Sequence, residues 1–453
     1  MVKLNEQTRE EYMNQVMTAA MKGDIDEFRH LFLELHPADQ TDVFLHLEPA
    51  ERSRVYEYLS PEEFAEIFEG FEVDEQKEIA NELNKHYAAE MFNNMYADDV
   101  ADFFNELPPE NVDDILKAMS TEEADDVREL LTYEEGTAGA IMTKEFIAIK
   151  ATDSVGEVIE RLRREGPTAE TIYYLYVINQ KGGLVGVTSI RDLITSSSQE
   201  TIQNIMSTRV VSVYVATDQE EVALLIQKYD FLAAPVVTEH NVLVGIVTVD
   251  DVIDVLEEEA MEDLGEITAS RGSTDMTLTA LQAAVKRAPW IILLMFFGLF
   301  TAEVIGRFEK TLETVVMLAA FIPMIMGSAG NTGTQSLAVS VRALATGSLE
   351  KQGLWRTIGR EFSTGLLIGV MSGVAIAGLL AIFYRDLLLG GIVGLSIMLS
   401  LGTASVVGSV VPLAINKMKL DPAIASGPFI TTLNDIVSLL IYFSVATSFL
   451  QYL

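Results

Sequence analysis

The sequence predicts a multi-domain protein with an all-α superhelical domain, a tandem pair of α/β domains, and an α-helical transmembrane domain with five spans. Charge divides the chain first: residues 1–280 hold 59 Asp and Glu against 20 Lys and Arg, whereas residues 281–453 hold 8 against 11. Short helical segments and one repeated α/β unit fill the acidic part, and long apolar runs fill the rest. Two chemically different parts therefore follow each other.

The composition of the acidic part excludes several classes of function. Its excess of carboxylates repels nucleic acid, so we expect no nucleic-acid partner. The chain has no cysteine and its five histidines are dispersed, which excludes disulfides and a zinc cluster. It has no Gly-Lys-Ser/Thr phosphate loop and no nucleophile beside a base, so we expect no enzyme. The polar N-terminus lacks a signal-peptide core, which indicates a cytoplasmic start.

Residues 1–134 predict an acidic α-helical domain. From His36 to Leu131 short segments recur at intervals of eleven or twelve residues, among them "EPAERSRVYEYL", "SPEEFAEIF" and "YADDVADFFNEL". Proline, serine or aspartate followed by an acidic residue is typical of a helix start. One such unit cannot bury its apolar face alone, so the repeats predict a superhelix of short helices.

Residues 135–200 and 201–258 predict two copies of one α/β unit. The segment "IMTKEFIAIKATDSVGEVIERLRRE" aligns with "IMSTRVVSVYVATDQEEVALLIQKYD", and "YVINQKGGLVGVTSIRDLI" aligns with "PVVTEHNVLVGIVTVDDVI". Each copy predicts strand, helix, strand, strand, helix. We expect Gly186 and Gly245 at the tight connections between strands.

Residues 259–285 predict a connecting helix, and an acidic face begins just before it. In "VDDVIDVLEEEAMEDLGEITA" the carboxylates fall at three- and four-residue spacing along one helix face: Asp251, Asp254, Glu258, Glu259, Glu262 and Asp263. Like charges so placed destabilise a helix, and a divalent cation would offset the repulsion. The alternative, which this stretch alone favours, is a solvated acidic face.

Five apolar runs in residues 286–453 predict membrane spans, because a helix needs about 20 residues to cross the hydrocarbon core. They cover residues 288–308, 314–336, 365–384, 390–415 and 422–450. With the N-terminus inside, eight Lys and Arg flank the inner ends and three flank the outer ends. This bias predicts a multi-pass protein of the cell (inner) membrane with cytoplasmic N-terminal domains and the C-terminus outside.

Two acidic residues lie in these runs, Glu303 near the outer end of the first and Asp435 well inside the fifth. An ionised carboxylate near the bilayer centre costs roughly 3 kcal/mol, so Asp435 is a candidate functional residue. No Lys or Arg lies in the interior of a run to pair with it. A cation is therefore the expected partner, and a protonated Asp that hydrogen-bonds another helix is the alternative.

The second run ends in "PMIMGSAGNTGTQSLAVSVRAL", which is polar and rich in glycine. We expect its proline and glycines to loosen the helix and expose carbonyl groups: Pro323, Gly327, Gly330 and Gly333. Asn331, Thr332, Thr334 and Gln335 add further oxygens. Oxygen ligands without sulfur or imidazole suit a hard cation, and one carboxylate among neutral oxygens favours hydrated Mg²⁺. Close helix packing at the glycines is the alternative.

The α/β repeats resemble paired cystathionine-beta-synthase (CBS) domains, which bind adenosyl nucleotides or act as regulatory hinges. In that family an aspartate after the last strand contacts the ribose, and "SIRDLI" places Asp192 there. The resemblance implies ATP as a possible ligand, with Tyr174 and Phe231 stacking on the base. The alternative is that Asp192 caps the following helix.

The whole chain resembles the MgtE family of magnesium channels. The stretches "PMIMGSAGNTGTQS" and "FITTLNDIVSLLIYFSVA" are similar to its membrane motifs, and the order of domains is the same. The resemblance implies a homodimer in the lipid bilayer with a pore on the two-fold axis, lined by the second and fifth spans. It assigns Asp435 as the pore carboxylate for hydrated Mg²⁺, with Gly330 and Asn331 nearby.

The resemblance also implies closure by internal Mg²⁺ bound between the acidic domain, the CBS pair and the connecting "plug" helix. The matching carboxylates are Glu66, Asp98, Asp102, Asp218, Glu220, Asp230, Asp251, Asp254, Glu259, Glu262, Asp263 and Asp421. The function it implies is a Mg²⁺-selective channel for magnesium uptake. An ion-coupled secondary transporter and a membrane-anchored nucleotide sensor are the alternatives.

Overall fold

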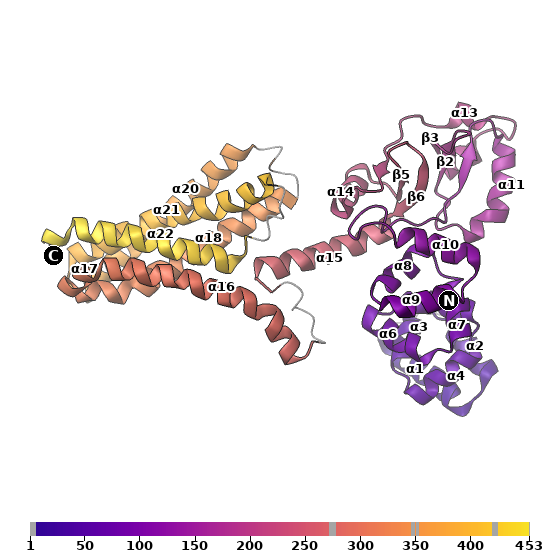
Figure 1. Cartoon of the computed structure of the whole chain (residues 1–453), viewed down its shortest axis with the longest axis horizontal. Coiled ribbons are helices and arrows are strands. Elements are labelled where there is room, and N and C mark those ends of the chain that lie inside the picture. Colours follow the sequence, from indigo (N-terminus) through magenta and orange to yellow (C-terminus); the bar gives the residue numbers. More distant parts are fainter. Residues whose placement is uncertain (1–5, 271–277, 346–348, 350–352, 419–424, 453) are drawn as a thin grey trace. The chain divides into compact units, whose positions relative to one another are not determined.

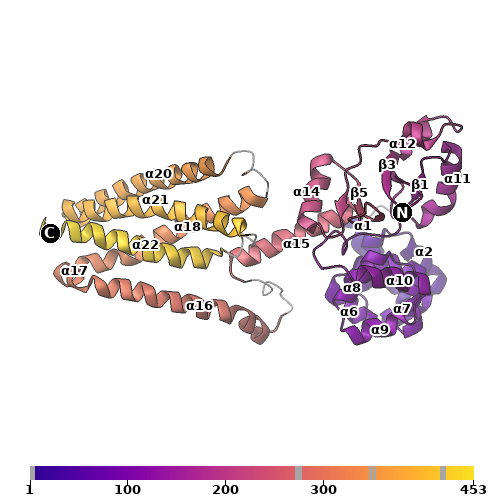
Figure 2. The ribbon, with the colours of Figure 1, turned by 45° about the horizontal axis from the view of Figure 1, so that its top comes forward.

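The computed structural model describes residues 6–270, 278–345, 349, 353–418 and 425–452. Its contacts divide the chain into two units, Met1–Glu257 and Glu258–Leu453. The first unit contains short helices and two small sheets, and the second contains long apolar helices (Figures 1 and 2). This composition confirms the predicted multi-domain fold class.

The first unit begins with a series of short helices. They are α1 (Glu6–Lys22), α2 (Ile25–Leu33), α3 (Pro37–Leu45), α4 (Pro49–Tyr58), α5 (Pro61–Phe68), α6 (Val73–Glu82), α7 (Lys85–Phe92), α8 (Ala97–Asn105), α9 (Pro109–Leu116) and α10 (Thr121–Leu130). Prolines occupy the first positions of α3, α4, α5 and α9, where the missing N–H has no cost. Ser60 and Glu63 form a capping box at α5. The buried rings of Phe68, Phe92 and Phe103 pack together and join α5, α7 and α8.

Two three-stranded sheets follow, in the orders β1-β2-β3 and β4-β5-β6. The first repeat contains β1 (Ala148–Lys150), α11 (Val155–Glu165), η1 (Gly166–Thr168), β2 (Tyr174–Ile178), β3 (Leu184–Ser189) and α12 (Ile190–Thr195). After α13 (Ile202–Ile205), the second contains β4 (Val213–Tyr214), α14 (Gln219–Tyr229), β5 (Ala233–Val237), β6 (Leu243–Thr248) and α15 (Val249–Ile267). In each sheet the first pair is parallel and the second antiparallel, as a strand-helix-strand-strand-helix unit requires.

The placement of two glycines at strand connections is wrong. Gly186 and Gly245 lie inside β3 and β6. A Cβ on Gly186 would lie 2.7 Å from Sδ of Met206, so the glycine lets the later segment around Met206 cross the strand closely. The turns instead lie at Gly182 and Asn241, whose φ angles are 78° and 59°, a region that favours these residue types.

The helical series shares one hydrophobic core with the second repeat, whereas the first repeat has a core of its own. Polar contacts join the helical series to the segment before β1. Nζ of Lys144 lies 2.8 Å from a carboxylate oxygen of Asp126 and also contacts Glu129, both on α10. Glu145 accepts a hydrogen bond of 3.2 Å from the backbone N–H of Ala97, the first residue of α8. These contacts hold α8 and α10 against the repeats.

Helix α15 starts directly after β6 and runs as one helix to Ile267. The acidic segment that the sequence places in a connecting helix at 259–285 therefore begins as the continuation of the last helix of the second repeat. Within the second unit, the end of α15 packs through Ile267 against Leu337, Val341 and Ile430.

Among its described residues, the second unit has five helices that are long and apolar enough to span a membrane: Ala280–Arg307, Val316–Leu344, Leu354–Phe383, Leu387–Lys417 and Gly427–Ser448. They comprise α16 (Ala280–Arg307), η2 (Val316–Phe321) with α18 (Ile322–Ala345), α20 (Leu354–Phe383), α21 (Leu387–Lys417) and α22 (Gly427–Ser448). Between the first two lies α17 (Glu309–Thr314), and η4 (Leu450–Tyr452) follows the last. The third helix begins earlier than predicted and so includes Glu361.

A seam of small residues joins α20 to α21. Gly365, Gly369 and Gly373 lie on the buried face of α20, and a Cβ on Gly373 would lie 2.5 Å from the carbonyl oxygen of Gly394 on α21. Such close approach is typical of membrane helices, whose association depends on packing because lipid is as apolar as the side chains. By contrast, α16 has no buried residue within its own chain.

Candidate functional site

Asp435 lies on α22 and is half-buried. Its Oδ1 atom is buried and has no hydrogen-bond partner within the described part of the chain. Two neighbouring hydroxyls bond to their own helix instead: Ser438 donates to the carbonyl of Asp435 at 3.1 Å, and Thr432 donates to the carbonyl of Pro428 at 2.8 Å. The carboxylate thus retains an acceptor for a ligand from outside its helix.

The polar stretch of the second span is helical throughout, as α18 runs without interruption from Ile322 to Ala345. The expectation that Pro323, Gly327, Gly330 and Gly333 loosen this helix is therefore wrong. Two of these glycines are contact points instead, which was the alternative interpretation. A Cβ on Gly330 would lie 2.7 Å from Cγ2 of Thr431 on α22. Glycine is needed there because the two helices approach closely.

Three helices meet at Gly333. A Cβ on Gly333 would clash with the side-chain amide of Asn434 on α22, and a Cβ on Gly408 of α21 would clash with the carbonyl oxygen of Gly333. Asn434 is 1% exposed, and neither atom of its amide has a hydrogen-bond partner among the described residues. The sequence reasoning missed Asn434, although a second polar residue beside Asp435 inside an apolar span is itself a visible signal.

Asn331 faces away from this junction. Together with Gly327 and Gln335 it forms a stripe of exposed residues at four-residue spacing along α18, whereas Gly330 is buried against α22. Residues at this spacing share one helix face. The structure therefore places the predicted pore residues Gly330 and Asn331 on different faces of the same helix, and only the Asn331 face is open.

A second candidate site is a group of carboxylates where α8 meets the repeats. Asp98 is 6% exposed, and its Oδ1 atom lacks a hydrogen-bond partner within the described residues. Burial, and then the Asp99 and Asp251 carboxylates, raise the pKa of Asp98 well above its usual range. Burial and the Asp251 charge raise the pKa of Asp99 to about 7, and burial and the same charge raise the pKa of Glu170 to about 8.

Asp251 joins this cluster from the second repeat. It accepts hydrogen bonds from the backbone N–H of Thr248, at 3.2 Å, and from the Thr248 hydroxyl. Burial raises the pKa of Asp251 despite these bonds. In the first repeat Ser189 and Asp192 make the same arrangement. The position that the CBS resemblance assigns to a ribose-binding aspartate thus lies, in the second repeat, within an acidic cluster.

Like charges held this close disfavour the ionised state, and oxygen ligands alone suit a hard divalent cation. Among the described residues, however, no three acidic or histidine side chains are close enough to hold one metal ion directly. An ion at this cluster would accordingly keep part of its water, as Mg²⁺ commonly does. Sequence reasoning missed Asp99, Glu145 and Glu170, because only the fold brings these separate segments together.

The other predicted regulatory carboxylates lie in several places. Glu66, Asp102 and Asp254 are exposed on α5, α8 and α15. Asp218 caps the start of α14, where its side chain accepts from the N–H of Glu220 at 2.9 Å, and Asp230 ends that helix in a left-handed conformation. An eleven-residue helix is about 16 Å long, so one chain does not bring Asp218 and Asp230 together.

The remaining acidic residues of this set lie in the second unit. Glu259 and Glu262 lie on α15, and both are half-buried. Asp263 belongs to the same helix, but its side chain lies outside the described residues. Asp421 lies outside the described residues altogether.

The predicted nucleotide residues are partly assembled. Asp192 caps α12, because its Oδ2 atom accepts from the backbone N–H of Ser189 at 3.1 Å and from the hydroxyl at 2.6 Å. Tyr174 is the partner of Ser189 across the β2–β3 pair, which places it beside that cap. Phe231 instead stacks on Tyr229, with ring centroids 5.3 Å apart, and packs against the core shared with the helical series.

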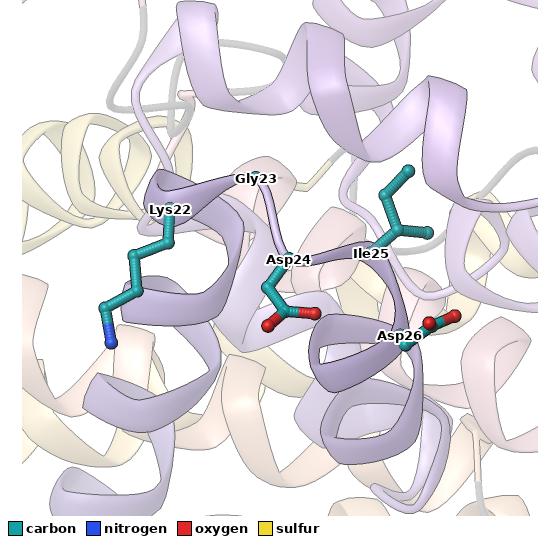
Figure 3. Close-up of a pocket in the computed structure, with 5 residues that line it drawn as sticks. All are labelled: Lys22, Gly23, Asp24, Ile25 and Asp26. Carbon is teal, nitrogen blue, oxygen red and sulfur yellow. The ribbon is translucent and has the colours of Figure 1, made fainter.

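A shallow surface hollow between α1 and α2 contains none of the candidate residues. Figure 3 shows the residues that line it: Lys22, Gly23, Asp24, Ile25 and Asp26. Asp24 accepts a hydrogen bond of 3.2 Å from the backbone N–H of Glu27. The hollow is therefore explained by the turn that caps α2.

Known protein families match most of this chain. The sequence matches the family described as a divalent cation transporter, MgtE, over residues 322–445, the MgtE intracellular N domain over residues 35–136, and the CBS domain over residues 138–198 and 202–258. It is 48% identical over 319 residues to the magnesium transporter MgtE of Bacillus subtilis, covering 70% of this chain and 71% of that protein. It is 42% identical over 325 residues to that of Thermus thermophilus, covering 70% and 71%.

Solved structures agree with this assignment. The soluble part of a magnesium transporter superposes with a TM-score of 0.54 at 43% identity, covering 56% of this chain and 99% of that chain. The cytosolic domain of the Mg²⁺ channel MgtE in complex with ATP superposes with a TM-score of 0.51 at 37% identity, covering 54% and 99%. The chain therefore belongs to the MgtE family of divalent cation transporters.

Proposed function

We propose that this protein is a Mg²⁺-selective channel for magnesium uptake, which closes when internal Mg²⁺ is high. The curated relatives are named magnesium transporters, and the donors in its spans are oxygen atoms that suit a hard cation. Asp435 is the ion-binding carboxylate of the pathway. Its unpartnered oxygen accepts hydrogen bonds from the water around the ion, so the ion passes without losing its hydration shell.

The observation that carries the proposal is the exposed polar stripe on α18. Gly327, Asn331 and Gln335 are exposed from their own chain at membrane depth. Lipid offers no hydrogen bonds, so side-chain amides in this position need water or a protein partner. A water-filled pathway on the two-fold axis of a homodimer supplies both, with α18 and α22 of each copy along its wall.

Exposed apolar residues of the first unit support a homodimer. Tyr173 and Leu232 directly precede β2 and β5, and they are 58% and 43% exposed. Ile194 and Ile253 occupy the same position in α12 and α15, and they are 71% and 59% exposed. The two repeats thus present equivalent apolar residues, and a second copy of the chain is a self-complementary partner for such a surface.

The acidic cluster is the proposed sensor of internal Mg²⁺. Asp98 offers a buried oxygen without a partner among the described residues, and Asp99 and Asp251 surround it with negative charge. Regulatory Mg²⁺ at these carboxylates would neutralise their repulsion and stabilise the contact between α8 and the second repeat. When Mg²⁺ falls, the repulsion returns and the contact loosens. Because Mg²⁺ favours one of two states, it shifts their populations.

Helix α15 links the sensor to the pathway. It carries Asp251 near its start, and its last residue, Ile267, packs within the second unit. The carbonyl oxygen of Ile267 lies 3.2 Å from the position of a Cβ on Gly427, the first residue of α22. A change at the start of α15 therefore reaches the helix that carries Asp435. Several ions acting together make the response steep.

ATP is the proposed ligand of the first repeat, since a relative with 37% identity was solved with ATP. Asp192 would contact the ribose and Tyr174 the base. The protein lies in the cell membrane with the first unit in the cytoplasm and the C-terminus outside, as the distribution of Lys and Arg indicates.

The test is Mg²⁺ flux into liposomes that contain the full chain, with proton and sodium gradients collapsed. Wild type should carry Mg²⁺ under these conditions, and Asp435→Asn should abolish the flux, because the amide cannot replace the charge. Glu303→Gln is the matched control, since Glu303 is exposed on α16 and pairs with Arg307. Flux that requires a proton or sodium gradient would indicate a coupled transporter. Intact flux in Asp435→Asn would favour a nucleotide sensor.

A further inference from the structure

Glu361 is a buried carboxylate on a membrane-spanning helix that the proposed pathway does not use. It lies on α20 with 8% of its side chain exposed, one turn before the glycine seam that packs on α21. Its Oε2 atom accepts a hydrogen bond of 3.1 Å from the hydroxyl of Ser336 on α18. Its Oε1 atom accepts from Nε and Nη2 of Arg360, at 3.3 and 3.2 Å.

These bonds do not identify Glu361 as a residue needed for stability. Burying a carboxylate has a large desolvation cost, and replacing a buried ion pair by apolar residues is often neutral for folding. A buried and fully bonded carboxylate does fix geometry, because its bonds are directional and costly to break. The geometry that Glu361 fixes is the position of Ser336.

Ser336 connects Glu361 to the candidate ion site. It is 4% exposed and lies on α18, three residues after Gly333. The side chain of Asn434 packs directly on Gly333, where a Cβ would leave no room for it. Asn434 directly precedes Asp435 on α22. Since α20 otherwise packs chiefly on α21, the Glu361–Ser336 bond provides a polar link from α20 to α18. A continuous series of contacts thus runs from α20 to the pore carboxylate.

We propose that Glu361 is a positioning residue for Mg²⁺ permeation. Through its bond to Ser336 it fixes the position of α18 along its axis, so that Gly333 stays opposite Asn434. The position of Asn434 in turn sets the orientation of Asp435 toward the ion. Coupling of this kind travels through packed contacts that have a defined arrangement. A displacement of less than 1 Å at a binding group is enough to change ion preference. The inference rests on the proposed function, since it assigns Asp435 to the pathway.

The test measures Mg²⁺ flux through the full chain in liposomes at a range of Mg²⁺ concentrations, and Mn²⁺ flux in parallel. Ser336→Ala and Glu361→Ala should each raise the half-saturating Mg²⁺ concentration roughly tenfold, the effect expected for loss of one hydrogen bond to a charged group. Both should also lower the preference for Mg²⁺ over Mn²⁺. The double variant should be no worse than either single variant, because both remove the same bond.

Two variants serve as controls. Glu361→Gln can still accept the hydroxyl of Ser336, so it should retain a half-saturating concentration near that of the wild type. Arg360→Gln removes a side chain that is 52% exposed and leaves the Ser336 bond in place, so it should behave in the same way. A role in stability alone would lower the thermal midpoint without moving the half-saturating concentration or the ion preference.

The outcomes distinguish this inference from the proposed function. Unchanged half-saturation and ion preference in Ser336→Ala, with flux abolished in Asp435→Asn, would overturn the positioning role and leave the channel standing. Additive effects in the double variant would also overturn it. Absence of Mg²⁺ flux in the wild type would overturn the proposed function itself. If Glu361→Ala fails to fold, Ser336→Ala decides the question, because removing one hydroxyl leaves the helix packing intact.

Discussion

Raising the pH without divalent cations should loosen the contact between α8 and the second repeat. Burial raises the pKa of Asp99 to about 7 and that of Glu170 to about 8. In the folded state these carboxyl groups therefore keep protons that an unfolded chain has already lost. Their contribution to stability is fully present below the ordinary carboxyl pKa of about 4, and it is lost as the pH rises through the folded-state values.

The magnitude follows from the two pKa values. Each pH unit between the ordinary and the raised pKa removes about 1.4 kcal/mol per group. The pKa of Asp99 lies about one pH unit above pH 6, and that of Glu170 about two units above it. Raising the pH from about 6 past both values therefore removes at most roughly 4 kcal/mol of stability. Both side chains are partly exposed, and solvent screening reduces the effect to about 2 kcal/mol. The equilibrium constant for opening should change roughly 30-fold.

Limited proteolysis of the full-length protein measures this opening. In a chelating buffer, cleavage of the first unit should be faster at about pH 8.5 than at about pH 6, once the rate is corrected with an unfolded substrate at each pH. Millimolar-range Mg²⁺ should remove the difference, because the ion replaces the lost protons. Asp99→Asn should reduce it as well. Equal corrected rates at both pH values in chelator would refute the reasoning.

Three further predictions concern packing, docking and nucleotide binding. Gly408→Ala should lower the free energy of unfolding by about 3 kcal/mol or prevent folding, because the new Cβ would meet the backbone of Gly333. Gly378→Ala is the control, since Gly378 has open space around it, and it should leave the thermal midpoint unchanged. Equal midpoints for both variants would contradict the packing. Lys144→Met should weaken docking of α10 by about 1–2 kcal/mol, seen as faster proteolysis of the first unit, whereas an unchanged rate would show that its ion pairs are dispensable. Asp192→Ala should lower ATP affinity at least about tenfold in calorimetry without altering Mg²⁺ flux in ATP-free buffer, and unchanged affinity would remove Asp192 from the nucleotide site.

Local signals were sufficient to predict the fold class. Proline and acidic residues mark the helix starts of the first domain, the repeat reveals the two α/β units, and apolar runs mark the spans. The errors arose where tertiary packing overrides local propensity. The glycines of α18 indicated a broken helix, yet α21 and α22 pack on them and keep it regular. Gly186 likewise indicated a turn, but it lies in a strand because Met206 packs on it.

The residues of the candidate sites were likewise predictable only where a local signal in the sequence marks them. Asp435 could be predicted because a lone carboxylate in an apolar run is visible in the sequence. Glu361 could not, since it lies among flanking polar residues and only the longer helix α20 carries it into the bundle. Asp98 and Asp251 were predicted by resemblance. Glu170 was not, because the fold rather than the sequence brings its loop to α8.

Single-channel recording with controlled Mg²⁺ on the cytoplasmic face tests the central claim most directly. We predict discrete openings whose probability falls steeply as cytoplasmic Mg²⁺ rises, because in the proposed mechanism the ions bridge the acidic cluster and α15 transmits the change to α22. Asp98→Asn should shift the closing concentration upward and leave the conductance of the open pore unchanged. Openings with the same probability at all Mg²⁺ concentrations, or the absence of discrete openings while Mg²⁺ flux persists, would contradict the account.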